Sequence, residues 1–425
     1  MSKTRIVFAW VLPCAIAASL ATSLYWGSVL QAHPKSDQES LDRIKMLHDL
    51  VQEVYVNDVP SEKIYEGAAK GMLSALDPFS EYFSPDEYKE LQIDTTGEFG
   101  GLGIEISIED TWLTVVTPIE DTPAFRAGIQ AGDRVTEIDG ETTEGFTTTM
   151  AVKKLRGKPG TKVTLTVYHK AGMAPEKIDI TRDIIKLKSV KGAKFVDADK
   201  TIGYIRVTAF QEDTTASFEK AARDLIAQGA KGLIVDLRFN GGGLLDEAIG
   251  LVDLFLADGV IVSTRGRLEK ENKVFRAKKD GTLPDLPLAV LVNDSSASAS
   301  EIFSGAIRDH HRGVLVGSRT YGKGSVQTII PLDDDQAAVK LTTAKYYTPS
   351  GECIHHEKGA KKWGIEPDIK IELTPQQMAD LQKHRANEDV IVNPGDKPEP
   401  DKFEDIQQSR AIDLLKALIA LNGKK

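Results

Sequence analysis

Three short segments of the sequence carry residue types that could perform catalysis. The first, residues 293–302, reads Asn-Asp-Ser-Ser-Ala-Ser-Ala-Ser-Glu-Ile and connects an apolar run of strand length to a predicted helix. In this turn Ser298 would be exposed near the positive end of the helix, where a developing oxyanion is stabilised. Small neighbours would let a substrate backbone approach. Taken alone, the segment favours an ordinary serine-rich helix cap over a nucleophile.

The second segment, residues 320–327, reads Thr-Tyr-Gly-Lys-Gly-Ser-Val-Gln and places Lys323 between two glycines. A lysine deprotonates a serine only if burial lowers the pKa of its ammonium toward neutrality. Ser-Lys pairs of this kind are a known variant of the catalytic triad. The simpler interpretation is a solvated lysine on a glycine turn.

The same lysine ends a G-x-x-x-x-G-K pattern that begins at Gly317 and resembles the opening of a phosphate-binding loop. Such a loop needs Ser or Thr next, to hold Mg²⁺, whereas this chain has Gly324. Residues 326–331 also read as a strand, although a phosphate-binding loop should open a helix. The nucleotide-binding interpretation is therefore rejected.

The third segment, residues 236–243, reads Asp-Leu-Arg-Phe-Asn-Gly-Gly-Gly between a buried strand and a helix. Consecutive glycines there can turn backbone N–H groups toward a substrate oxygen, as an oxyanion hole requires. A glycine run alone is weak evidence, because a flexible turn has the same composition.

These segments belong to a chain for which we expect a multidomain α+β and α/β fold. Residues 33–95 are predicted to be helical, residues 96–183 form a mostly β domain, and residues 184–375 alternate buried strands with helices. Residues 376–425 are expected to be a charged linker followed by an amphipathic helix. That helix could pack on its own domain or pair with a second subunit, and the sequence does not decide.

The N-terminal segment, residues 1–32, indicates export. Lys3 and Arg5 precede residues 6–30, which contain no charged side chain. This order is typical of a signal peptide, yet the stretch is long enough to span a bilayer. We therefore expect an exported, periplasmic protein, either soluble after cleavage or anchored to the inner membrane, and the choice stays open.

Composition excludes several classes of protein. The net charge is 53 − 63 = −10, which argues against general nucleic-acid binding. The two cysteines, Cys14 and Cys353, are too few for a disulfide framework or a cysteine zinc cluster. No metal or cofactor is implied.

Together the three catalytic segments resemble those of the carboxyl-terminal processing, or tail-specific, proteases, which are PDZ-containing Ser/Lys peptidases with a crotonase-like α/β core. The resemblance implies that Ser298 is the nucleophile, that Lys323, 25 residues later, is the general base, and that Gln327 orients the lysine. It also implies an oxyanion hole made by the N–H of Ala299 and one from Gly242 or Gly243. Gly241 stands where this family often has proline.

The β domain resembles a PDZ domain. Residues 100–104 read Gly-Gly-Leu-Gly-Ile and match the loop that captures a terminal carboxylate, so the implied peptide-binding residues are Gly101, Leu102, Gly103 and Ile104. A peptide would add as a strand beside residues 104–108. Arg156, which ends the following helix, matches a position that can couple domain placement to the active site, and it is a regulatory candidate.

The implied function is that of a serine endopeptidase that binds the C-termini of exported proteins and cleaves them through an acyl-enzyme. An inactive PDZ scaffold is the alternative. A PDZ-bearing trypsin-like protease is disfavoured, because its PDZ domain would follow the catalytic domain and its nucleophile would read Gly-x-Ser-Gly. The expected partners are protein substrates. The sequence leaves open a homo-oligomer, an adaptor protein, and whether the PDZ domain activates or inhibits.

Overall fold

The computed structural model describes residues 35–169, 174–332, 336–391 and 403–422, so the predicted leader, residues 1–32, lies outside the described part. The chain divides into two units, Met1–Tyr82 and Phe83–Lys425. In the first unit two helices, α2 (Lys35–Val54) and α3 (Ser61–Ser74), form an antiparallel pair that precedes the short strand β1 (Glu81–Phe83). Among the described residues no helix is both long and apolar enough to cross a membrane.

The second unit begins with helix α4 (Pro85–Thr96), which leads into the β domain through a two-stranded ribbon of β2 (Glu98–Gly101) and β9 (Asp183–Lys186). Alternation of apolar and polar residues then produces an antiparallel sheet in the order β3-β4-β5-β7-β8. Its strands are β3 (Ile104–Glu109), β4 (Trp112–Pro118), β5 (Arg134–Ile138), β7 (Lys162–Tyr168) and β8 (Glu176–Thr181), with β6 (Glu141–Thr142) paired to β5. Helices α5 (Pro123–Arg126) and α6 (Thr148–Leu155) complete the domain. Strand β3 is an edge strand.

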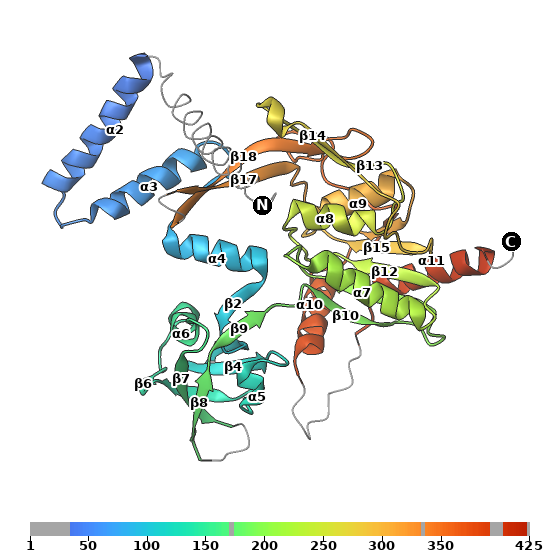
Figure 1. Cartoon of the computed structure of the whole chain (residues 1–425), viewed down its shortest axis with the longest axis horizontal. Helices are drawn as coiled ribbons and strands as arrows, with labels where there is room; N and C mark the ends of the chain where they lie inside the picture. The colour runs from blue at the N-terminus through green and yellow to red at the C-terminus, as the bar shows by residue number, and fades with distance from the viewer. Residues whose placement is uncertain (1–34, 170–173, 333–335, 392–402, 423–425) are drawn as a thin grey trace, which may run out of the picture. The chain divides into compact units, whose positions relative to one another are not determined.

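The α/β core is built on a second sheet in the order β10-β11-β12-β15-β16-β19. Its strands are β10 (Val190–Phe195), β11 (Ile202–Val207), β12 (Gly232–Asp236), β15 (Leu288–Val292), β16 (Val314–Gly317) and β19 (Ile369–Lys370), and all but β10 are parallel. Helices α7 (Thr214–Ala227), α8 (Leu245–Asp253) and α9 (Ala299–Asp309) cover one face of the sheet (Figure 1). The central strands are mostly apolar, as is usual where both faces of a sheet are covered, and Arg206 of β11 and Asp236 of β12 are buried exceptions.

A smaller antiparallel sheet flanks this core. It contains β13 (Val260–Gly266), β14 (Lys273–Arg276) and the long hairpin of β17 (Ser325–Leu332) and β18 (Ala337–Tyr347), with a 3₁₀ turn at Glu269–Glu271. The hairpin follows directly on the loop that carries Lys323, so this sheet fixes where that loop ends.

The C-terminal region differs from the predicted charged linker. Residues Pro375–Asp389 form helix α10, which Thr374 caps by accepting a hydrogen bond from Gln377 N–H. The helix forms because Leu381 and Arg385 are buried against the core, and two positions are too few to produce a clear apolar period. The final helix, α11 (Ile406–Asn422), packs on the second face of its own sheet through Ala411 and Leu415.

Candidate active site

Ser298 occupies a strained turn between β15 and α9. Its backbone has φ 54° and ψ −113°, a region that non-glycine residues rarely adopt and that costs about 1–3 kcal/mol. The flanking residues Ala297 and Ala299 are buried, whereas Ser298 itself is half-buried. Because Ser298 caps α9, its side chain lies beside the N–H groups of the first helical turn. The turn therefore holds one serine at the positive end of a helix.

Hydrogen bonds attach this turn to the glycine-rich loop at residues 236–243. The backbone carbonyl of Asn240 accepts from Ala297 N–H (3.0 Å) and from the Ser300 hydroxyl (2.9 Å). The Ser296 hydroxyl donates to the Leu237 carbonyl at 2.8 Å. The serine turn and the glycine-rich loop are thus one rigid assembly, although about 60 residues of sequence separate them.

The backbone of Gly242 lies close to the serine turn. A Cβ atom there would lie 2.8 Å from the Ala297 oxygen and 2.8 Å from Ser298 Cβ, and the residue has a φ of +102°, so only glycine fits. Its N–H donates to Asn240 Oδ1 at 2.8 Å. Gly243 has a φ of +142°, and its N–H forms no hydrogen bond within the described residues. Of the two glycines predicted as alternative oxyanion donors beside Ala299, Gly243 is therefore the one whose N–H is available within the described residues.

Glu301 joins the serine turn to the lysine loop, a role that its sequence motif did not predict. Its carboxylate is fully buried and accepts from Ser298 N–H (2.9 Å), Thr320 hydroxyl (2.6 Å), Gly322 N–H (2.7 Å) and Lys323 N–H (2.8 Å). Burial raises the pKa of Glu301, and these hydrogen bonds offset part of the rise. The Ser-x-x-Glu spacing from Ser298 to Glu301 is a capping-box signal that could have drawn attention to it.

Lys323 lies in the loop between β16 and β17, where neighbouring backbone groups fix its position. Gly322 carbonyl accepts from His356 N–H at 2.8 Å, and Gly324 carbonyl accepts from Tyr346 N–H at 3.0 Å. Lys323 and Ser298 line the same cleft, of about 870 Å³. The structure therefore brings the predicted nucleophile and the predicted base into one site.

Three further predicted residues of the mechanism, Ala299, Gly243 and Gln327, line the same cleft, whereas Gly242 is not part of its lining. The Gln327 side-chain amide donates to the Ser325 hydroxyl (2.9 Å) and to the Thr342 hydroxyl (3.3 Å). These contacts fix the side chain beside the lysine loop, and its role in orienting Lys323 stays a prediction. The cleft walls include apolar side chains such as Ile302 and Val326, and Leu91 of α4.

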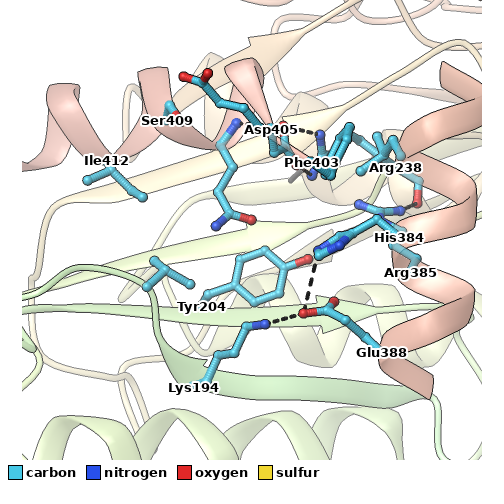
Figure 2. Close-up of a pocket in the computed structure, with 14 residues that line it drawn as sticks. Lys194, Tyr204, Arg238, His384, Arg385, Glu388, Phe403, Asp405, Ser409 and Ile412 are labelled. Atoms are coloured by element: carbon cyan, nitrogen blue, oxygen red, sulfur yellow. Dashed lines mark hydrogen bonds and ion pairs between the residues drawn. The ribbon is translucent and has the colours of Figure 1, made fainter. Parts of the chain in front are cut away.

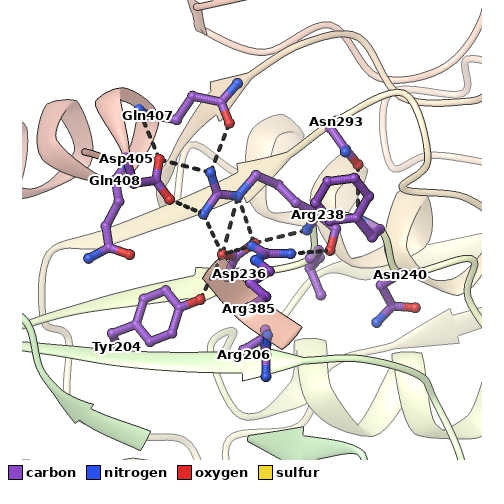
Figure 3. A network of polar contacts seen from close by, with 12 residues as sticks. Tyr204, Arg206, Asp236, Arg238, Asn240, Asn293, Arg385, Asp405, Gln407 and Gln408 are labelled. Carbon is purple, nitrogen blue, oxygen red and sulfur yellow. Dashed lines mark hydrogen bonds and ion pairs between the residues drawn. The ribbon is translucent and has the colours of Figure 1, made fainter. Parts of the chain in front are cut away.

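A buried charge cluster anchors the start of the glycine-rich loop (Figure 3). Asp236, with no exposed surface, accepts hydrogen bonds from the guanidinium groups of Arg238 (2.7 Å to Nη2) and Arg385, and from the Tyr204 hydroxyl (2.8 Å). Burial by itself would raise the pKa of Asp236. The charges of Arg238 and Arg385, with the hydrogen bonds from Arg238 and Tyr204, more than offset this and hold the pKa well below its usual value. The loop therefore starts from an ionised, fully paired carboxylate.

In the β domain, the predicted peptide-binding residues lie beside the exposed edge of β3. The Leu102 carbonyl accepts from Ala124 N–H (2.9 Å), and the Gly103 carbonyl accepts from Ile119 N–H (2.8 Å). Within the described residues the N–H groups of Leu102 and Gly103 donate no hydrogen bond. The loop is thus held by its carbonyl groups while its N–H groups remain available to an anion.

Arg156 follows α6 directly and contacts the helix that forms one wall of the catalytic cleft. Its guanidinium pairs with Glu90 of α4 at 2.5 Å and lies 4.7 Å from the centre of the Phe99 ring. Leu91, Asp94 and Thr95 of the same helix line the catalytic cleft. Arg156 therefore links the helix beside the predicted peptide groove to the cleft wall.

Comparison with known proteins agrees with this organisation. Three family models match: peptidase family S41 at residues 201–371, the PDZ domain at 100–180, and the N-terminal domain of the activating protease CtpB at 25–87. A carboxy-terminal-processing protease of Bartonella bacilliformis is 43% identical over 349 residues, which cover 81% of this chain and 78% of the relative. The carboxy-terminal processing protease CtpA of Bacillus subtilis is 34% identical over 377 residues, which cover 88% of this chain and 78% of the relative.

Among solved structures, an S41-type protein of Bacteroides fragilis is 15% identical and has a TM-score of 0.50, covering 88% of this chain and 97% of its own, which shows the same fold. The predicted multidomain fold, with a PDZ domain and an α/β core, is confirmed. With a relative 43% identical over most of both lengths, the chain belongs to the carboxy-terminal-processing protease family, the PDZ-containing serine peptidases that its motifs resemble.

Proposed function

We propose that the chain is a serine endopeptidase in which Ser298 attacks the peptide bond and Lys323 is the general base. The observation that carries this proposal is that both residues line one cleft and that a single buried carboxylate, Glu301, binds the backbone of each. Such a link fixes the separation of nucleophile and base before a substrate arrives, as positional catalysis requires.

In the acylation step, neutral Lys323 takes the proton of the Ser298 hydroxyl while Oγ forms a bond to the substrate carbonyl carbon. The carbonyl oxygen becomes an oxyanion that accepts hydrogen bonds from Ala299 N–H at the start of α9 and from Gly243 N–H. When the C–N bond breaks, the leaving amine takes the proton from the lysine ammonium. The N-terminal part of the substrate remains as an ester on Ser298.

In the deacylation step, Lys323 takes a proton from water, the hydroxide attacks the ester, and Ser298 regains its proton as the carboxylic acid leaves. Gln327 keeps the lysine side chain directed at Ser298 during both steps. All of these groups come from the chain itself, so the proposed steps use no cofactor.

The PDZ domain selects the substrate by its C-terminus. A terminal carboxylate would accept hydrogen bonds from the N–H groups of Leu102 and Gly103, and the last residues would extend the sheet beside β3, which is an edge strand. Gly101 and Ile104 flank the carboxylate site. Substrates are then exported proteins with an accessible tail, since residues 1–32 would direct this chain out of the cytoplasm as a cleaved signal or an anchor.

The test uses the purified full chain and an unstructured protein substrate with a free C-terminus. Wild type should cleave it, whereas Ser298→Ala and Lys323→Ala should each lose activity by at least about 10³-fold while keeping the same unfolding midpoint. Intact-mass measurement should show an acyl-enzyme adduct on wild type only. Near-normal cleavage by either variant would overturn the Ser298/Lys323 dyad. If wild type does not cleave the substrate, the alternative of a catalytically inactive PDZ scaffold would be favoured.

A paired substrate tests recognition of the tail. Converting the C-terminal carboxylate to an amide removes the group that the loop at residues 101–104 would bind. Measured as binding to the inactive Ser298→Ala protein, this change should weaken affinity by about tenfold or more, because the loss of a charged hydrogen-bond acceptor costs roughly 1.5–3 kcal/mol. Equal affinity for acid and amide would overturn the carboxylate site.

A further inference from the structure

The family match to the peptidase region ends at residue 371, yet the helix beyond it reaches the base of the glycine-rich loop. Arg385 of α10 is 8% exposed and belongs to the buried cluster around Asp236 (Figure 3). A charged side chain is rarely this buried unless it is fully paired. The contacts of Arg385 therefore indicate what the helix contributes.

Within the described part of the chain Arg385 contacts three residues of the loop, Asp236, Arg238 and Phe239. Its Nη2 group pairs with the Asp236 carboxylate, its Nη1 group donates to the Arg238 carbonyl at 3.0 Å, and its guanidinium lies 5.0 Å from the centre of the Phe239 ring. One planar guanidinium thus holds a carboxylate, a carbonyl and an aromatic face at once, which a lysine cannot reproduce.

The loop needs such support because Phe239 is strained. Its φ of +65° is uncommon for a bulky residue and costs about 1–3 kcal/mol, so surrounding contacts must hold it. The backbone N–H of Phe239 donates to Asn293 Oδ1 at 2.9 Å, and the Arg385 guanidinium lies 5.0 Å from the centre of its ring. If Phe239 relaxed, the turn that follows it would shift.

That turn sets the direction of the predicted oxyanion donor. Asn240 Nδ2 donates to the Val207 carbonyl (2.8 Å), Asn240 Oδ1 accepts from Gly242 N–H, and the Asn240 carbonyl accepts from Ala297 N–H. Gly243 comes next and lines the cleft. The position of its N–H therefore depends on the conformation of residues 236–240.

We propose that Arg385 is a positioning residue of the active site: it holds residues 236–239 in the conformation that directs Gly243 N–H at the oxyanion. This inference rests on the proposed function for its catalytic consequence. It extends the functional unit beyond the matched peptidase region. Asp405 and Gln407, at the start of α11, also accept hydrogen bonds from the Arg238 guanidinium, at 2.6 Å and 2.9 Å.

The alternative is that α10 only covers the core, in which case any contact of this helix would matter equally. A second ion pair of the same helix, away from the loop, provides a matched control for this alternative. Asp389, one turn further along the same helix, pairs with the buried Arg206 of β11 and with Lys191, and within the described residues it forms no hydrogen bond or ion pair with the loop. The pocket between α10 and the sheet shows a second such contact, in which Glu388 pairs with Lys194 and His384 (Figure 2). Removing these pairs should loosen the helix while the contacts of Arg385 with Asp236, Arg238 and Phe239 stay in place.

The experiment compares Arg385→Met, Arg385→Lys and Asp389→Asn in the full chain, with cleavage of the unstructured substrate as the readout. We expect Arg385→Met to lower kcat by about 10- to 100-fold with KM within about threefold, since a misdirected oxyanion donor affects the transition state alone. Arg385→Lys should show a smaller loss in kcat with the fold intact. Asp389→Asn should leave kcat within about twofold, even where its unfolding midpoint falls.

A second measurement does not depend on proteolysis. Hydrogen exchange of the peptide spanning residues 237–244 should become faster by about tenfold or more in both Arg385 variants and stay at the wild-type rate in Asp389→Asn. Equal kcat losses in Arg385→Met and Asp389→Asn, or unchanged exchange in both Arg385 variants, would overturn the proposal. If wild type does not cleave or Ser298→Ala stays active, the proposed function fails instead, and the exchange result still decides whether Arg385 orders the loop.

Discussion

The Oε2 atom of Glu301 accepts a hydrogen bond of 2.8 Å from the backbone N–H of Lys323. The same oxygen accepts from Ser298 N–H at 2.9 Å, so one atom holds the backbones of the predicted base and the predicted nucleophile. The opposite oxygen, Oε1, binds Thr320 and Gly322. This carboxylate is acceptor-only, and each of its oxygens receives two donors.

A Glu301→Gln substitution should therefore damage the site although it preserves the shape of the side chain. The amide nitrogen cannot accept, so one pair of donors would face another donor. We expect a loss of stability of about 1–3 kcal/mol and a fall in kcat/KM of roughly 10- to 100-fold. Urea unfolding and steady-state cleavage measure the two effects. The exposed Asp294, changed to Asn in the same turn, is the control and should alter neither. Full activity in Glu301→Gln would show that the carboxylate link is dispensable.

Substitution by alanine should affect activity very differently at the neighbouring glycines Gly241 and Gly242. A Cβ at Gly242 would lie 2.8 Å from the Ala297 oxygen, at a φ that disfavours alanine, and would push the loop away from Ser298. We expect Gly242→Ala to reduce kcat by about 100-fold or more, comparable with the loss of an oxyanion donor. At Gly241 a Cβ meets nothing within 4 Å, so Gly241→Ala should retain activity within about threefold. A similar loss in both variants would mean that general loop stiffness, not close approach, controls the rate.

The acid stability of the protein should depend on Asp236. Its folded-state pKa lies below the unfolded value of 3.8, so its ionisation stabilises the fold above that pH, and the contribution is lost as the pH falls through the folded pKa. Asp236→Asn leaves two guanidinium groups without their shared partner and should cost about 3–5 kcal/mol at neutral pH. The difference in the free energy of unfolding between wild type and Asp236→Asn should stay constant above about pH 5 and become smaller below pH 3.8.

Urea unfolding at several pH values measures this difference. Asp199, 72% exposed and paired with Lys416 at the surface, is the control, and Asp199→Asn should cost under about 0.5 kcal/mol. A difference for Asp236→Asn that widens toward acid would contradict the depressed pKa.

Local sequence identified the segments of the site, and long-range contacts determined the rest. Ser298 and Lys323 stand out because small residues and glycines surround them within a few positions. The role of Glu301 depends on the approach of two loops that are 22 residues apart, which no local pattern encodes. Arg385 is harder still: it meets Asp236 across 149 residues, from a helix whose polar composition predicted a linker. Periodicity detects burial of several apolar residues, and it does not detect one buried arginine.

The final prediction concerns the link between the PDZ domain and the cleft. Arg156 pairs with Glu90 on α4, and the same helix contributes Leu91 and Asp94 to the cleft wall. If a bound tail acts on the site through this pair, a peptide with a free C-terminus should change the rate at which wild type cleaves a second, short substrate that has an amidated end. Arg156→Ala should abolish that change. Lys154→Ala, which removes a surface ion pair between α6 and Glu141 of β6, should preserve it.

A charge reversal separates the ion pair from general damage to the domain. Arg156→Glu should lose the effect of the tail, because it faces Glu90, and the double variant Arg156→Glu with Glu90→Arg should regain it in part. Binding of the tail peptide to each variant, measured in the Ser298→Ala background, should stay within about threefold of wild type, because Arg156 lies outside the loop at residues 101–104. A normal response to the tail in Arg156→Ala would remove Arg156 from the coupling between the two domains.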